Sequence, residues 1–156
     1  MKKTLNIEYE VLRRDELRPE DAQVLAAAEK ALDTAYNPYS HFAVGAALRL
    51  DDGTVVTGSN QENLAYPSGL CAERTAMFAA SAQHPGKRFE ALAIVGRTEE
   101  GELMGASPCG ACRQVMQEYE AKSGKKMRVI LYQKEDEILV VDGVETLLPF
   151  AFSADL

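Results

Sequence analysis

The sequence lacks both a long run of apolar residues and a cluster of lysines and arginines. A membrane-spanning helix needs roughly 20 consecutive, predominantly apolar residues, and no stretch of this 156-residue chain approaches that length. Asp and Glu outnumber Lys and Arg by 24 to 17, so the formal net charge is −7. Because nucleic acids and anionic membrane surfaces attract basic proteins, we expect neither as a partner.

Cysteine and histidine are also scarce. The chain has three cysteines, an odd number that argues against a closed disulfide framework, and two histidines. The first ten residues are too polar for the apolar core of a secretory signal peptide. We therefore expect a cytoplasmic protein with reduced cysteines. In a reducing compartment, metal binding or catalysis explains a C-x-x-C spacing better than a disulfide does.

Length and composition are typical of one globular domain. With 46% hydrophobic and 26% charged residues, a chain of this length can bury a substantial core. No repeat, low-complexity tract or linker divides it. We predict a single domain over residues 1–156, with residues 1–18 as an N-terminal strand or arm. Within that arm, apolar and polar residues alternate from Leu5 to Leu12, which predicts an edge strand.

The rest of the chain alternates between helical and strand patterns. The predicted helices cover residues 19–36, 72–83 and 109–124. The predicted strands cover residues 42–50, 54–58, 89–95, 127–132 and 138–141. The first two of these strands flank an Asp-Gly turn and predict an antiparallel hairpin. The segment between Gly58 and Leu70 is a long loop, and such loops often carry function. This order predicts an α/β sandwich with a mixed sheet.

The three cysteines fall in two short segments, each at the predicted start of a helix. Cys71 begins Cys-Ala-Glu-Arg, and Cys109 and Cys112 lie in Pro-Cys-Gly-Ala-Cys-Arg. At positions i and i+3 of a first helical turn, Cys109 and Cys112 share one face and can chelate together. Helix N-termini also lower thiol pKa values. Three such ligands can hold one zinc ion and leave its fourth tetrahedral position open, as in catalytic sites.

Glu73 follows Cys71 by two residues, so both can face one ion only near a helix end, where the geometry is freer. A carboxylate that does not bind the metal can carry protons to and from a metal-activated water. Three thiolates around a divalent cation carry a net charge of −1. Arg74 and Arg113, each next to a cysteine, are candidates to compensate this charge by donating to a ligand sulfur. The residues predict a zinc hydrolase.

Other interpretations of the cysteines remain open at this point. A C-x-x-C pair also occurs in structural zinc sites and in redox pairs, and cysteines can be buried and inert. A structural zinc usually has four protein ligands, for which His41 or His84 would have to supply the fourth. The catalytic interpretation fits the residues better, because a glutamate accompanies only three soft ligands.

The motifs around these residues resemble those of small, homotetrameric cytidine deaminases, a zinc-dependent type within the cytidine/deoxycytidylate deaminase superfamily. The resemblance runs from about Ala35 to the C-terminus, and its motifs are highly specific when taken together. The matching stretches are Pro38–Leu48, Gly58–Asn63, Tyr66-Pro67, Cys71–Ala76, Pro108–Gln114 and Leu147–Pro149. The fold implied is a three-layer α/β/α sandwich with a mixed sheet of about five strands.

The resemblance implies hydrolytic deamination of cytidine and 2′-deoxycytidine to uridine and 2′-deoxyuridine, with release of ammonia, in pyrimidine salvage. One Zn²⁺ per chain would be held by Cys71, Cys109 and Cys112. Glu73 would protonate N3 of the ring and then the departing amine. The implied assembly is a homotetramer whose active sites are shared between subunits.

The resemblance also implies a pocket for a nucleoside. Asn60 and Glu62 match the pair that binds the ribose, Phe42 matches an aromatic side chain beside the base, and the Ala72 backbone lies near the substrate. As alternatives, Phe42 could belong to the core, and Asn60 and Glu62 could be ordinary polar residues of a loop. The family usually has a small residue where Leu64 stands, which predicts an altered sugar end of the pocket.

Two further aromatic residues resemble those at contacts between subunits of this family. Tyr66 matches a residue of the wall between subunits. Phe152 matches a C-terminal side chain that stacks on the base bound by a neighbouring subunit, although residues near a chain end are commonly disordered. The N-terminal arm, residues 1–18, is longer than in compact members and is expected to extend the sheet or a subunit contact.

Two rival functions remain. One is a related deaminase of another cytosine-containing compound, such as an aminonucleoside antibiotic or a nucleotide. Glu62 favours a free nucleoside over a nucleotide, because its carboxylate would repel a phosphate on the nearby sugar. The other is a non-enzymatic, zinc-stabilised binding module, which would need four protein ligands and would have no use for Glu73.

Overall fold

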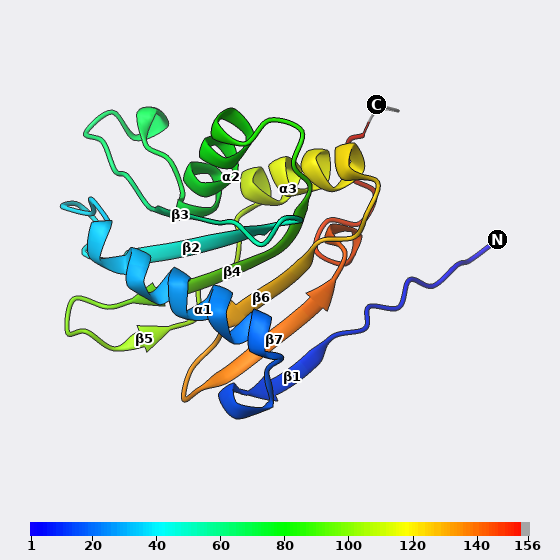
Figure 1. Ribbon diagram of the computed structural model, residues 1–156, viewed down its shortest axis with the longest axis horizontal. Helices are drawn as coiled ribbons and strands as arrows, with labels where there is room; N and C mark the ends of the chain where they lie inside the picture. Colours follow the sequence, from blue (N-terminus) through cyan, green and yellow to red (C-terminus); the bar gives the residue numbers. More distant parts are fainter. Residues whose placement is uncertain (154–156) are drawn as a thin grey trace.

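The computed structural model describes residues 1–153, which build one mixed sheet flanked by helices (Figure 1). The sheet has seven strands in the order β1-β7-β6-β4-β2-β3, with β5 paired to β4. Strands β4 and β6 are parallel, and the other pairs are antiparallel. The strands are β1 (Glu10–Arg13), β2 (Ala43–Leu50), β3 (Val55–Ser59), β4 (Phe89–Arg97), β5 (Leu103–Met104), β6 (Arg128–Tyr132) and β7 (Glu137–Asp142).

Helices cover both faces of this sheet. Helix α1 (Pro19–Ala31) packs on one face, and α2 (Ala72–Gln83) and α3 (Gly110–Ser123) pack on the other. Alternate residues of β4 enter the two cores: Val95 packs with the α1 cluster, whereas Ile94 packs with the cluster of α2 and α3. The predicted three-layer α/β/α sandwich is confirmed.

The sheet has two more strands than the five or so predicted. Strand β5 has two residues, too few to show an alternating pattern in the sequence. The strand predicted over Leu5–Leu12 is wrong in its bounds, because β1 starts only at Glu10. Helix α1 also ends earlier than predicted, at Ala31, and a 3₁₀ turn over Leu32–Thr34 follows it. Helix α2 has the predicted bounds.

Two glycines let the helices approach the sheet closely. A Cβ atom on Gly45 of β2 would collide with the backbone carbonyl of Ala28 in α1. A Cβ atom on Gly58 of β3 would lie 2.6 Å from the carbonyl oxygen of Ala72 in α2. Because glycine has no side chain, the backbones meet directly at both points. The start of α2, where Cys71 lies, is thereby held against β3.

A buried charge cluster joins the sheet to α1. Arg128 of β6 is 7% exposed, and its Nε donates to Asp21 Oδ2 at 2.7 Å. The same guanidinium contacts Asp142 Oδ1 of β7 at 3.1 Å and Glu10 Oε1 of β1 at 3.2 Å. Removing one partner of such a buried pair commonly costs about 3–5 kcal/mol. The Arg128–Asp21 pair therefore ties β6 to α1, and the half-exposed Glu10 adds a contact from β1.

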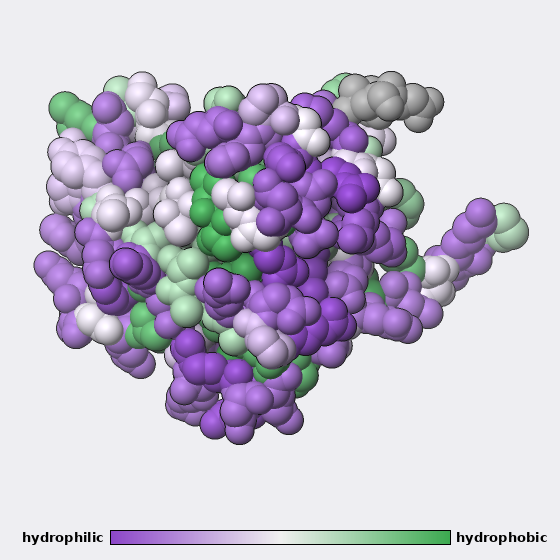
Figure 2. Space-filling view, in the orientation of Figure 1, coloured by the Kyte–Doolittle hydropathy of each residue, from purple (hydrophilic) through white to green (hydrophobic). Residues whose placement is uncertain are grey.

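The face seen in Figure 2 is mostly hydrophilic, with apolar side chains showing between the polar ones. Among residues 1–153, no helix combines the length and apolar character required to cross a membrane.

Candidate active site

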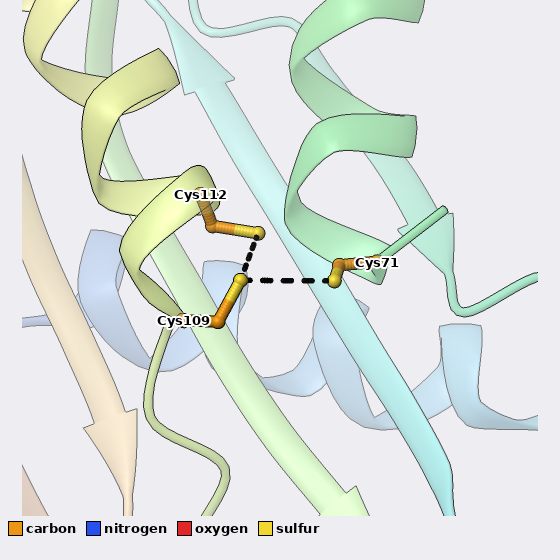
Figure 3. Close-up of side chains that lie close together, drawn as sticks. All are labelled: Cys71, Cys109 and Cys112. Atoms are coloured by element: carbon orange, nitrogen blue, oxygen red, sulfur yellow. Dashed lines mark hydrogen bonds between the residues drawn. The ribbon is translucent and has the colours of Figure 1, made fainter. Parts of the chain in front are cut away.

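The three cysteines meet where α2 and α3 begin. Cys71 and Cys109 are the N-cap residues of the two helices, and Cys112 lies in the first turn of α3, where it is fully buried. Figure 3 shows the three side chains pointing toward one another from the two helix ends. The Sγ atoms of Cys71 and Cys109 are 4.0 Å apart, and those of Cys109 and Cys112 are 3.5 Å apart.

This spacing fits a tetrahedral zinc site. Zinc–sulfur bonds of about 2.3 Å at tetrahedral angles place the sulfurs about 3.8 Å apart. All three Sγ atoms lie within 4.8 Å of one another. Within residues 1–153, no histidine or carboxylate joins this group as a fourth ligand, so neither His41 nor His84 completes a closed structural site there. Three protein ligands leave room for a reacting molecule on the metal.

The two arginines beside the cysteines have different partners. Arg74 Nη2 donates to Cys71 Sγ at 3.4 Å, as expected of a residue that compensates thiolate charge. Arg113 donates instead to two backbone carbonyls, that of Pro108 at 2.8 Å and that of Leu147 at 2.7 Å. Arg113 therefore holds the segment before Cys109 and the segment after η4 (Val144–Thr146) in place. Its Nε and Nη1 groups donate to carbonyl oxygens rather than to a cysteine sulfur.

The pKa values of the Cys71 and Cys112 thiols shift in opposite directions. The pKa of Cys71 falls to about 5, because the Cys112 thiol donates a hydrogen bond to it and Arg74 adds a hydrogen bond and a positive charge. The same bond to Cys71, together with burial and the nearby charge of Glu73, raises the pKa of Cys112. Cys71 is therefore a thiolate at neutral pH, the form in which cysteine binds a metal.

Glu73 lies in the first turn of α2 and is 4% exposed. Burial raises the pKa of its carboxyl group, and the negative charge of Cys71 raises it further. A raised pKa brings a carboxyl group closer to the neutral range, which favours a role as general acid–base. Glu73 interacts with the Cys112 thiol but is not one of the grouped metal ligands.

A cavity of about 660 Å³ opens beside the cysteines. Most of the residues predicted for the site line it: Phe42, Asn60, Glu62, Tyr66, Cys71, Ala72, Glu73, Arg74 and Cys109. Cys112, Arg113 and Phe152 are not among the lining residues, and Phe152 is 87% exposed near the end of the described chain. Leu64 also lies outside the lining and is 80% exposed, so it does not narrow the cavity within one chain.

Asn60 and Glu62 hold the wall of the cavity as well as lining it. Asn60 Oδ1 accepts from the Val44 backbone N–H at 2.8 Å, and its Nδ2 donates to the Phe42 carbonyl at 2.9 Å. Glu62 Oε2 accepts from the backbone N–H groups of Tyr39 at 2.9 Å and Ser40 at 3.2 Å. Burial raises the pKa of Glu62, but hydrogen bonds from the Ser40 side chain and from these two backbone N–H groups together outweigh it and lower the pKa. Glu62 is therefore anionic at neutral pH.

The structure adds lining residues that sequence reasoning did not single out, among them Tyr39, Ser40 and Val44. All three belong to the Pro38–Leu48 stretch that carries the resemblance, so this motif could have identified them as lining residues. The rings of Tyr39 and Tyr66 pack edge to face with centroids 6.2 Å apart. Ser107 also lines the cavity but lies outside the matching stretches, so no motif indicated it.

Residues 18–126 match the family model described as the cytidine and deoxycytidylate deaminase zinc-binding region. The chain belongs to this family. It is 45% identical to a cytidine deaminase of Sporosarcina psychrophila over 133 residues, covering 85% of this chain and 91% of that protein. A cytidine deaminase of Halalkalibacterium halodurans is 43% identical over 137 residues, covering 86% and 96% of the two chains.

Solved structures agree with the family assignment. The 1.6 Å crystal structure of a cytidine deaminase from Burkholderia pseudomallei superposes with a TM-score of 0.71 at 43% identity, covering 83% of this chain and 97% of that one. A cytidine deaminase from Mycobacterium tuberculosis gives 0.65 at 37% identity, covering 85% and 96%. The three-cysteine cluster lies within the matched zinc-binding region and fits one zinc ion per chain.

Proposed function

We propose that this member of the cytidine deaminase family hydrolyses cytidine and 2′-deoxycytidine to uridine and 2′-deoxyuridine, with release of ammonia. The observation that carries the proposal is the joint placement of three clustered cysteines and a buried glutamate at one nucleoside-sized cavity. Relatives at 43–45% identity over most of the chain are named cytidine deaminases, which supports the same reaction.

Cys71, Cys109 and Cys112 would hold the zinc ion, with Arg74 offsetting part of the thiolate charge. Zinc in such a site supplies Lewis-acid activation that makes a water molecule nucleophilic at neutral pH. Glu73 takes a proton from the attacking water and delivers it to N3 of the cytosine ring. It then delivers the second proton of that water to the amine at C4, which leaves as ammonia. Water replaces the amine, so the reaction needs no redox partner.

Asn60 and Glu62 are proposed to bind the sugar. Glu62 accepts two backbone N–H bonds through Oε2 and presents its carboxylate to the cavity. A carboxylate that accepts a hydrogen bond from a sugar hydroxyl rejects analogues that lack the sugar, because the charged group then stays unpaired. The same charge repels a 5′-phosphate and disfavours a nucleotide substrate. Phe42 lies in the same lining and is proposed to contact the base.

We propose that the chain acts as a single catalytic domain within a homotetramer. Tyr66, 75% exposed at the cavity, and Phe152, 87% exposed near the end of the described chain, are available to contact other subunits. An active site shared between subunits would use them to enclose the base. The three free cysteines are compatible with the reducing cytoplasm, where they would stay available for zinc.

The substrate assignment predicts the outcome of an absorbance assay on the purified protein with cytidine, deoxycytidine, cytosine and CMP. Both nucleosides are expected to be converted, each with one ammonia released per molecule. Cytosine lacks the sugar that Asn60 and Glu62 bind, and CMP brings a phosphate toward Glu62, so both are expected to react at least about 100-fold more slowly, the discrimination typical of a missing or repelled charged contact. Faster conversion of CMP than of cytidine would reject the nucleoside assignment.

A further inference from the structure

Of the segment predicted as an arm over residues 1–18, the first eight residues precede the sheet, and the word arm means these eight residues from here on. They project from the body of the molecule in Figures 1 and 2. Glu10 of β1 lies opposite Val140 of β7, and β7 ends only two residues further on, at Asp142. The sheet therefore has almost no strand left to pair with the arm. Within residues 1–153, the arm makes no hydrogen bond or ion pair with the rest of the chain.

The arm nevertheless has the residue pattern of an amphipathic strand. Leu5 and Ile7 alternate with polar residues, and Tyr9 and Val11 continue the series into β1. In an extended chain these four side chains lie on the same side. They are 47–59% exposed, the lowest value belonging to Ile7 and the highest to Tyr9. An exposed apolar strand with unpaired backbone groups is a template for another strand.

The charges along the arm indicate which strand can pair with it. Lys2 and Lys3 lie at one end of the arm, and Glu8 lies at the other. When two identical arms run antiparallel, the basic end of each meets the acidic end of the other. Opposite charges directly across a strand pair stabilise it, whereas like charges destabilise it. The arm of a second copy of this chain is therefore complementary in charge, because each arm carries both a basic end and an acidic end.

We propose that the arms of two copies of this chain pair as antiparallel strands, with Leu5 of one opposite Leu5 of the other. This register places Lys2 opposite Glu8, Thr4 opposite Asn6, and Lys3 opposite Ile7 on the same side of the ribbon as Leu5. It gathers the apolar side chains of both arms on one side of the ribbon. A shift of one residue would put Leu5 opposite a polar residue and divide the apolar surface between two sides.

The register also leaves the base of the arm undisturbed. Glu10 lies outside the paired stretch and keeps its contact with Arg128, which is anchored in turn by the fully buried Asp21. The arm thus extends from a fixed strand, which limits the directions it can take. A two-stranded ribbon alone is only marginally stable in water, so the pairing is best detected by trapping it.

Leu5→Cys in the full-length, zinc-loaded protein is the direct test. Two directly opposed residues are close enough for a disulfide. Mild oxidation with oxidised glutathione is expected to link two chains, with a dimer band on a non-reducing gel that disappears on reduction. Asn6→Cys is the matched control, because two residues 6 lie diagonally across the ribbon, about 7–8 Å apart, beyond disulfide reach. Equal rates of cross-linking for both variants would overturn the register.

The role of charge is tested in the Leu5→Cys background. Adding Lys2→Glu puts two acids opposite each other and is expected to slow cross-linking at least several-fold. Adding Glu8→Lys as well restores opposite charges and is expected to restore the rate. Cross-linking that ignores both changes would contradict the pairing. The arm lies outside the cavity, so deamination by all these variants is expected to match that of the parent protein. Failure of the arm pairing would therefore not contradict the proposed deamination, and failure of the deamination would not contradict the pairing.

Discussion

Glu73→Gln is expected to lower kcat for cytidine by about 10²–10⁴-fold, the usual contribution of a positioned general acid–base. Glutamine keeps the size of the side chain and its ability to hydrogen-bond but cannot carry a proton between water, N3 and the leaving amine. Because Glu73 is not among the clustered metal ligands, zinc content and circular dichroism should match the parent protein. Steady-state kinetics and metal analysis on the same sample check both expectations.

Glu118→Gln is the matched control. Glu118 is exposed on α3, so the same change of charge there should leave kcat within about twofold of the parent, as surface substitutions usually do. If Glu73→Gln retained most of its activity, the proton carrier would have to be another group. If it lost zinc together with activity, Glu73 would be supporting the metal site rather than moving protons.

Cys112→Ser is expected to abolish zinc binding and, with it, deamination. Cys112 is fully buried, and its Sγ lies 3.5 Å from Cys109 Sγ, close to the separation expected of two sulfurs on one zinc ion. A hydroxyl oxygen is a poor replacement for a thiolate at this position, because zinc prefers deprotonated sulfur and nitrogen ligands. The measurement is zinc content per chain after dialysis, together with turnover of cytidine, and both should fall to near background.

Ala111→Ser separates loss of the ligand from disturbance of the helix. It introduces a hydroxyl on the neighbouring, exposed residue of the same helical turn. This variant should keep its zinc and its activity. A Cys112→Ser protein that still held one tightly bound zinc ion would show that the metal uses a different set of ligands from the one assigned here.

The sequence predicted best those features that depend on local signals. The C-terminal end of α3 follows from Gly124, which adopts the left-handed conformation with φ 64° that glycine tolerates. The Asp-Gly turn correctly indicated the hairpin of β2 and β3, with Gly53 at φ 85°. The cysteines were placed at helix starts from their spacing, and the structure brings all three sulfurs together.

Features that depend on contacts distant in sequence were not predictable. Arg113 looked like a donor to sulfur because it follows Cys112, yet it donates to the carbonyls of Pro108 and of Leu147, the second of which is 34 residues away. The alternation at Leu5–Leu12 is that of a strand, but β7 ends too early to pair with most of it. A pattern of side chains shows that a segment can form a strand, whereas the rest of the fold decides whether a partner strand is present.

Titration of metal-free protein with zinc shows whether the metal at the three cysteines is required for turnover. Zinc is removed with a chelator and added back in small steps, while cytidine turnover and bound zinc are measured on each sample. We expect no turnover without zinc, a rise proportional to bound metal, and a plateau at one ion per chain, the capacity of the three-cysteine cluster. Full turnover by the metal-free protein, or a rise that does not follow zinc binding, would contradict it.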